Sequence, residues 1–123
     1  MSDTAKRPAV RGWVAVAVVE GSDLTTGVGE HFGRSPRFLL VRGAAQTVQV
    51  LENTHAEAVQ GAGPATASLL ARHGVTAVIA GRFGPKAEDA LRAAGVLPVV
   101  AEPGTKAEAA LAGLQPEMIA AVG

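Results

Sequence analysis

With 123 residues the chain has the length of one domain, and its 11 basic residues balance its 11 acidic ones, which argues against a strongly basic nucleic-acid-binding face. It contains no cysteine, which excludes disulfides, a thiolate nucleophile and a cysteine-ligated metal site. No apolar run approaches the roughly 18 residues of a membrane span, so a soluble, cytoplasmic protein is expected. Residues 1–11 are predicted to form a flexible N-terminal arm, and residues 12–123 a single domain.

The first half of the chain predicts three strands. The β-branched and alanine-containing run at 13–19 is typical of a central strand buried on both faces. Residues 20–36 combine glycines and acids without apolar periodicity and predict a long loop, a kind of segment that is more often functional than idle. Residues 37–42 and 46–52 predict two strands joined by a short hairpin turn at 43–45.

From residue 64 the pattern alternates between helix and strand. Helices are predicted at 64–73 and 85–94, each with proline in the first helical position and glycine after its end. Strands are predicted at 75–80 and 97–101, and Pro98 suggests a sheet edge for the second of them. A third helix carries the apolar stripe Ala107, Ala110, Leu111 and Leu114, with Thr105 and Glu108 spaced as a capping box. Such alternation predicts an α/β fold, with a mainly parallel sheet covered by helices on both faces.

Three glycine-containing segments could carry chemistry: 30–34, 61–64 and 81–86. The last two precede proline-started helices, whose free N–H groups and dipole favour an anion. If strands 13–19 and 75–80 are parallel neighbours, their carboxyl ends bring the loops that follow them into one crevice. The residues predicted to bind a ligand there are His31, Gly33, Arg34, Gly61, Gly63, Arg82, Gly84 and Lys86. The alternative is that Gly63 and Gly84 serve only as helix caps and turn formers.

The aromatic and imidazole side chains have different expected roles. His31 could ligate a metal through its neutral imidazole. His73 lies in the last turn of a predicted helix, where a cation is favourable, so a structural role is expected. His55 is expected to be a solvated loop residue, with a second metal ligand as the alternative. Phe32 and Phe83 could either pack in the core or form a wall of the pocket.

Enzyme motifs fit the sequence poorly. It has no phosphate-binding Gly-Lys-Ser/Thr loop, no His-Glu-x-x-His motif and no serine in a nucleophile-elbow context. Glu20, Asp23 and Glu30 could form a carboxylate site for a divalent cation, although acids in a glycine-rich loop are more often solvated. A protein that is not an enzyme is therefore expected.

The motif His31-Phe32-Gly33-Arg34, the pair Gly61 and Gly63, and the segment 74–96 resemble, in this order and spacing, the dinitrogenase iron–molybdenum cofactor biosynthesis family. The resemblance covers about residues 12–114. It implies a ribonuclease-H-like three-layer sandwich with a five-stranded mixed sheet whose second strand runs antiparallel. It also implies that His31 is the best candidate ligand for a metal cluster, with Arg34 beside it.

The leading hypothesis is a non-enzymatic carrier of an anionic iron–sulfur or iron–molybdenum-type cluster, acting in nitrogenase cofactor biosynthesis (nitrogen fixation) or a related process. His31 would ligate the cluster, and Arg34, Arg82 and Lys86 would neutralise its charge. Cofactor-assembly or nitrogenase-like proteins are the expected partners, and neither nucleic acid nor a membrane is. The alternative hypothesis is a metal-free regulatory or interaction domain that binds an anionic metabolite.

Overall fold

A computed structural model describes residues 12–42 and 47–114, so the predicted arm at 1–11 and the hairpin turn at 43–45 lie outside the described residues. Strands and helices follow one another nearly as the sequence predicts. In chain order they are β1 (Trp13–Val18), β2 (Arg37–Arg42), β3 (Thr47–Glu52), α1 (Ala62–Arg72), β4 (Val75–Ala80), α2 (Pro85–Ala93), β5 (Leu97–Val100) and α3 (Ala107–Ala112).

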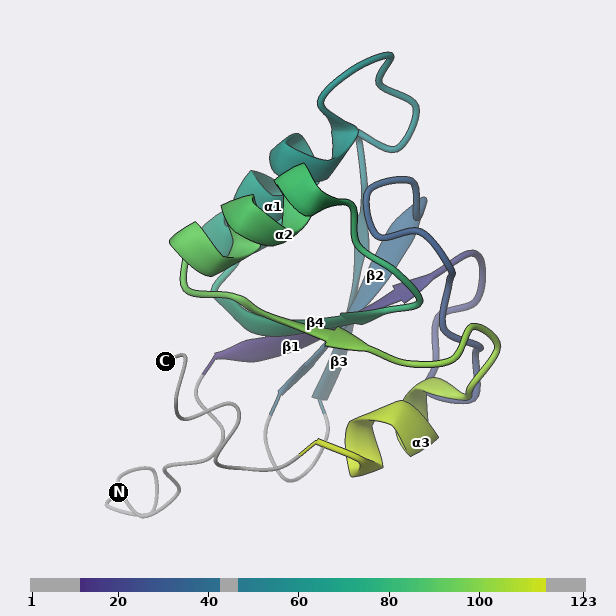
Figure 1. Cartoon of the computed structure of the whole chain (residues 1–123). Coiled ribbons are helices and arrows are strands. Elements are labelled where there is room, and N and C mark those ends of the chain that lie inside the picture. The colour runs from purple at the N-terminus through teal and green to yellow at the C-terminus, as the bar shows by residue number, and fades with distance from the viewer. Residues whose placement is uncertain (1–11, 43–46, 115–123) are drawn as a thin grey trace, which may run out of the picture.

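The strands form one mixed sheet in the order β3-β2-β1-β4-β5 (Figure 1). β1 pairs in parallel with β4, and β4 in parallel with β5. β2 runs antiparallel to both of its neighbours, β1 and β3. The five-stranded mixed sheet with an antiparallel second strand is thus confirmed, and β5 lies at an edge, as Pro98 predicted.

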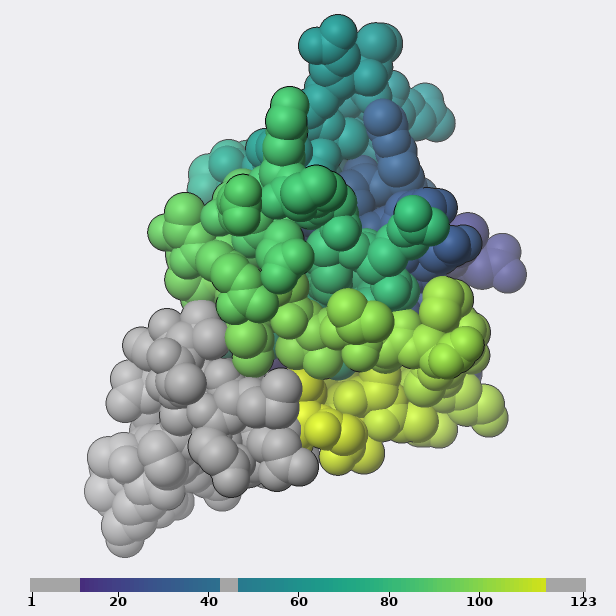
Figure 2. All heavy atoms as spheres, in the orientation of Figure 1, coloured from purple at the N-terminus to yellow at the C-terminus, as the bar shows by residue number. Residues whose placement is uncertain are grey.

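Helices cover both faces of the sheet. On one face, Ala15 and Ala17 of β1 pack in a core cluster with residues of α1 and α2, among them Leu70 and Leu91. On the other face, Val16 of β1 packs in a second cluster to which α3 contributes. In the space-filling view α2 and α3 lie on opposite sides of the band of residues that contains β5 (Figure 2). Successive side chains of β1 point to opposite faces of the sheet, and helices cover both faces. The fold is therefore the expected three-layer α/β sandwich.

The predicted start of α1 is wrong by two residues. The helix begins at Ala62, and Gly61 is its N-cap with a left-handed φ of 73°. Pro64 therefore occupies the third helical position instead of the first. Proline is tolerated there because the N–H groups of the first turn have no partner within the helix.

The predicted capping box of α3 is also wrong. Lys106 is the N-cap residue, and no side chain caps the helix. Instead, the first N–H groups donate to loop carbonyls: Ala107 N to Thr26 O at 2.8 Å, and Glu108 N to Leu24 O at 2.9 Å. The loop that follows β1 thus satisfies the start of α3 through the backbone.

Candidate functional site

A cleft of about 620 Å³ opens at the end of the sheet where the parallel strands β1 and β4 finish. Its walls come from three segments: 31–34, 61–64 and 82–87. All eight residues predicted to bind a ligand line it, namely His31, Gly33, Arg34, Gly61, Gly63, Arg82, Gly84 and Lys86. This is the position in which open α/β sheets bind ligands, and the volume lies within the range of small-molecule sites.

The backbone holds two of these segments together. Gly81 N donates to Gly29 O at 2.9 Å, and Phe32 N donates to Arg82 O at 3.1 Å. His31 and Arg82 consequently face each other across a short parallel bridge. The loop after β1 and the loop after β4 thus form one continuous edge of the cleft, along which the backbones of His31 and Arg82 are paired.

The N-termini of α1 and α2 also line the cleft. Neither helix has a side-chain cap, and in each the first N–H with an intrahelical partner bonds to the N-cap carbonyl: Ala65 N to Gly61 O at 3.0 Å and Glu88 N to Gly84 O at 2.9 Å. Proline supplies no N–H in either first turn. The remaining first-turn donors are the backbone N–H groups of residues 62, 63, 86 and 87, all of which line the cleft. Two helix N-termini therefore present donors and positive partial charge to the same space.

Two of the cleft glycines are required by close packing. A Cβ on Gly33 would lie 2.9 Å from Gly63 Cα, and a Cβ on Gly63 would lie 2.8 Å from Ala87 Cβ. Gly84 differs, since a Cβ there would meet nothing within 4 Å. Gly84 is the N-cap of α2, whereas Gly63 lies inside α1, so the expectation that Gly63 caps a helix is wrong. Gly63 instead lets the 31–34 loop and the two helices meet.

We predict that Gly63→Ala destabilises the fold by about 1–3 kcal/mol, because the added methyl group overpacks the contact with Ala87. Urea unfolding followed by circular dichroism would measure it. Gly84→Ala is the matched control: it adds the same methyl group in open space at a φ of −71° and should cost less than about 1 kcal/mol. Equal losses for the two variants would contradict the packing role of Gly63.

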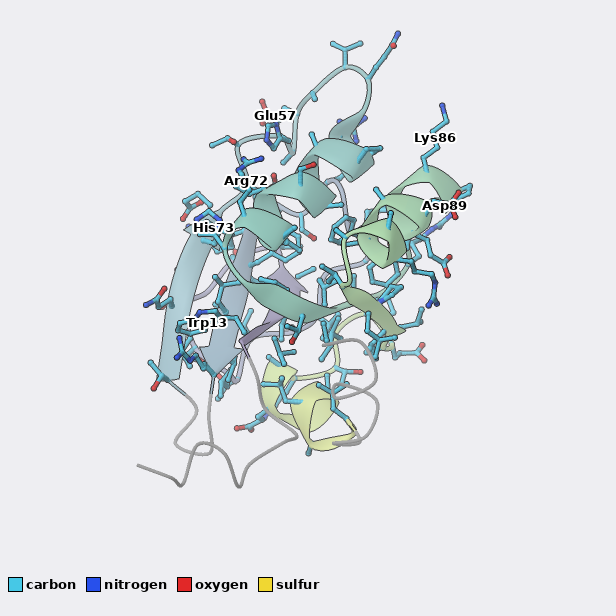
Figure 3. The ribbon with its side chains drawn as sticks, turned by 90° about the vertical axis from the view of Figure 1, so that its left-hand side faces the viewer. Trp13, Glu57, Arg72, His73, Lys86 and Asp89 are labelled. Atoms are coloured by element: carbon cyan, nitrogen blue, oxygen red, sulfur yellow. The ribbon has the colours of Figure 1, made fainter. Side chains whose placement is uncertain are left out.

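The three cationic side chains of the cleft, those of Arg34, Arg82 and Lys86, differ in how far they are already bonded to other groups. Nη1 of Arg34 donates to the carbonyls of Ala56 and Ala58 at 3.1 and 2.6 Å and so holds the loop before α1. Arg82 lies 3.5 Å from the carboxylate of Glu30. Lys86 extends outward from the first turn of α2 (Figure 3). Arg34 therefore has a structural bond besides its expected role toward an anion.

A buried polar network beneath the cleft was not predicted. Asn53, which is 6% exposed, donates from Nδ2 to Ser35 O at 2.9 Å and accepts on Oδ1 from Thr66 Oγ1 at 3.3 Å. Ser35 Oγ in turn donates to His31 O at 2.8 Å. This chain of bonds ties α1 to the backbone of the loop that carries His31. The sequence signal for this network was Asn53 directly after a strand together with Thr66 inside an otherwise apolar helix.

The other candidate residues have structural surroundings. His73 lies at the C-cap of α1, where Nδ1 bonds to Leu69 O at 2.9 Å, in agreement with its expected structural role. His55 donates its backbone N–H to Asn53 Oδ1 at 3.0 Å and is not among the residues that line the cleft. Phe32 belongs to the core cluster, Phe83 is partly buried and packs against it, and both line the cleft. Each ring therefore contributes both to the core and to the cleft wall.

The acids of the loop after β1 do not gather. The Asp23 carboxylate accepts hydrogen bonds from the hydroxyl and the backbone N–H of Thr25, and these bonds lower the pKa of Asp23 below its usual value. In the part of the chain that the structure describes, no three His, Asp or Glu side chains come close enough to hold a metal ion. The carboxylate-site alternative is therefore wrong.

These features define a three-layer α/β protein with a glycine-lined, cation-bearing cleft where its parallel strands end. Residues 13–117 match the model of the family described as dinitrogenase iron-molybdenum cofactor, and the chain belongs to that family. None of the described helices has the length and apolar character needed to cross a membrane.

Two solved structures and one sequence relative are similar to this chain. The apo form of the orange protein from Desulfovibrio gigas is similar with a TM-score of 0.77 and 30% identity, covering 82% of this chain and 84% of that one. A Thermotoga protein proposed to be a NifB protein gives a TM-score of 0.69 and 34% identity, over 83% and 85% of the two chains. An uncharacterised protein of Methanocaldococcus jannaschii is 36% identical over 69 residues, which span 54% of this chain and 58% of that protein.

Proposed function

We propose that this protein is a non-enzymatic carrier that binds an anionic iron–sulfur or iron–molybdenum-type cluster as its cargo, with residues 12–123 as the binding domain. The observation that carries the proposal is the convergence of His31, three cationic side chains and two uncapped helix N-termini on one cleft. Membership of a family described by the dinitrogenase iron–molybdenum cofactor supports a metal cluster as the anion.

The donor set fits a loosely held cargo. His31 supplies one imidazole ligand, while Arg34, Arg82 and Lys86 neutralise negative charge and the backbone N–H groups near Gly63 and Gly84 bond to anionic ligands of the cluster. Cysteine thiolates, which hold clusters permanently in most iron–sulfur proteins, do not occur in this chain. One side-chain ligand in an open cleft permits exchange, as a carrier requires.

The partners follow from the cargo. A carrier receives the cluster from a protein that assembles it and delivers it to a protein that uses it, so we propose cofactor-assembly and nitrogenase-like proteins, in the cytoplasm, as donor and acceptor. One similarity supports a cofactor-assembly setting: the Thermotoga protein is proposed to be a NifB protein. Nitrogen fixation is the proposed setting, or a related process that handles such clusters.

Anaerobic purification with iron and molybdenum analysis tests the proposal. The chain is analysed as isolated, and again after mixing with a synthetic thiolate-capped iron–sulfur cluster or an extracted iron–molybdenum cofactor and desalting. We expect close to one cluster per chain after loading. Absence of metal under every condition, together with a rise in melting temperature when inorganic phosphate is added, would replace the carrier by the metal-free domain that binds an anionic metabolite.

A further inference from the structure

Glu30 places a negative charge beside the cationic wall of the cleft. Its Oε2 atom lies 3.5 Å from Nη1 of Arg82, and its Oε1 atom lies 3.9 Å from Nε2 of His31. One carboxylate thus faces two of the side chains proposed to meet the cargo. The Glu30 carboxylate would repel an anionic cargo, whereas the Arg82 guanidinium with which it pairs would attract one.

The backbone fixes this arrangement. The hydrogen bond from Gly81 N to Gly29 O holds the two segments in register, and a Cβ on Gly81 would lie 2.8 Å from Glu30 Cα. Glycine at position 81 therefore permits Glu30 to lie directly over the start of the loop that carries Arg82. The proximity of the carboxylate to Arg82 follows from the pairing of two backbone segments.

We infer that Glu30 is a built-in competing anion for the cleft. It pairs with Arg82 while no cargo is bound, and the incoming anion must displace it. The carboxylate side chain is 53% exposed and can turn into solvent without leaving a buried charge. The inference rests on the proposed binding of an anionic cargo, and it assigns to Glu30 the role of lowering affinity so that the cargo can be released.

The substitution Glu30→Gln removes the charge and keeps the size of the side chain. We expect the variant to bind both the synthetic thiolate-capped iron–sulfur cluster and inorganic phosphate about two- to fivefold more tightly than the natural chain, the range that an exposed ion pair gives. The difference should shrink at high salt, which screens exposed charges. Glu88→Gln is the matched control, because Glu88 pairs with Arg92 at 3.2 Å on α2 and does not line the cleft.

The two anions separate this inference from the proposed function. If both chains bind phosphate but not the cluster, the cluster proposal fails, while tighter phosphate binding by Glu30→Gln still supports the role of Glu30. Equal or weaker binding of both anions by Glu30→Gln, or no binding of either anion by either chain, overturns the inference. In an Arg82→Gln background the effect of Glu30→Gln should be smaller, because Arg82 is the cation for which Glu30 competes.

Discussion

Replacing His31 by alanine should reduce cluster retention to background, with affinity at least roughly tenfold lower, because loss of a directly coordinating side chain should cost no less than loss of an outer-shell partner. The described contact of the His31 side chain is with the exposed carboxylate of Glu30, which lies 3.9 Å from Nε2, so folding stability should change by less than about 0.5 kcal/mol. Iron analysis after anaerobic loading and desalting measures the first effect, and urea unfolding measures the second.

His73→Ala is the matched control for this experiment. It also removes an imidazole, but from the C-cap of α1, away from the cleft. Cluster retention by this variant should equal that of the natural chain. If His31→Ala retains the cluster as well as His73→Ala does, His31 is not the ligand, and the N–H groups and cations of the cleft hold the cargo alone.

Replacing Phe32 by alanine should cost about 3–5 kcal/mol of folding stability. Phe32 is 1% exposed, and its ring centroid lies 5.6 Å from that of Phe38 and 5.2 Å from that of Phe83. The truncation leaves a cavity under the loop that carries His31 and Arg34, so these side chains also lose their fixed position. Denaturant unfolding gives the free energy of unfolding, and anion binding is compared under conditions in which the variant is still folded.

Phe83→Ala is the comparison that tests whether burial, and not proximity to the cleft, causes the loss of stability in Phe32→Ala. Phe83 also lines the cleft but is only partly buried, so its truncation should cost less than that of Phe32. Phe32→Leu should recover most of the stability, because it refills the cavity with apolar volume. A loss below about 1 kcal/mol for Phe32→Ala would mean that the loop collapses onto the core and that Phe32 does not anchor it.

The fold was predictable because its strands and most of its helices carry local signals. The β-branched run of β1 requires burial on both faces, and Pro85 with Gly95 marks α2 by rules that act within one turn. The predicted start of α1 was wrong because Gly61, not the residue before Pro64, is the N-cap, and the predicted cap of α3 was wrong because long-range contacts replace it. The first N–H groups of α3 donate to carbonyls of the loop after β1, which is far away in sequence. No local sequence pattern predicts such bonds.

The residues that line the cleft were predictable, but the packing contacts and hydrogen bonds between them were not. Parallel neighbouring strands necessarily bring the loops at their carboxyl ends together, which is why segments 30–34 and 81–86 could be placed in one crevice. The contact of Gly33 with Gly63 and the bonds of Asn53 could not be foreseen, because they depend on the distance between layers. Likewise, a charge pattern does not reveal that Glu30 faces Arg82 or that Arg34 holds two loop carbonyls.

The meeting of Gly33, Gly63 and Ala87 bears on how the protein is made. These residues come from the first, middle and last thirds of the described chain, and their contacts form the floor on which the cleft rests. During synthesis on the ribosome, the nascent chain exposes His31 long before residue 87 is added. The cleft is therefore incomplete until α2 has emerged and docked, so a cargo of the kind proposed could bind only to the finished domain.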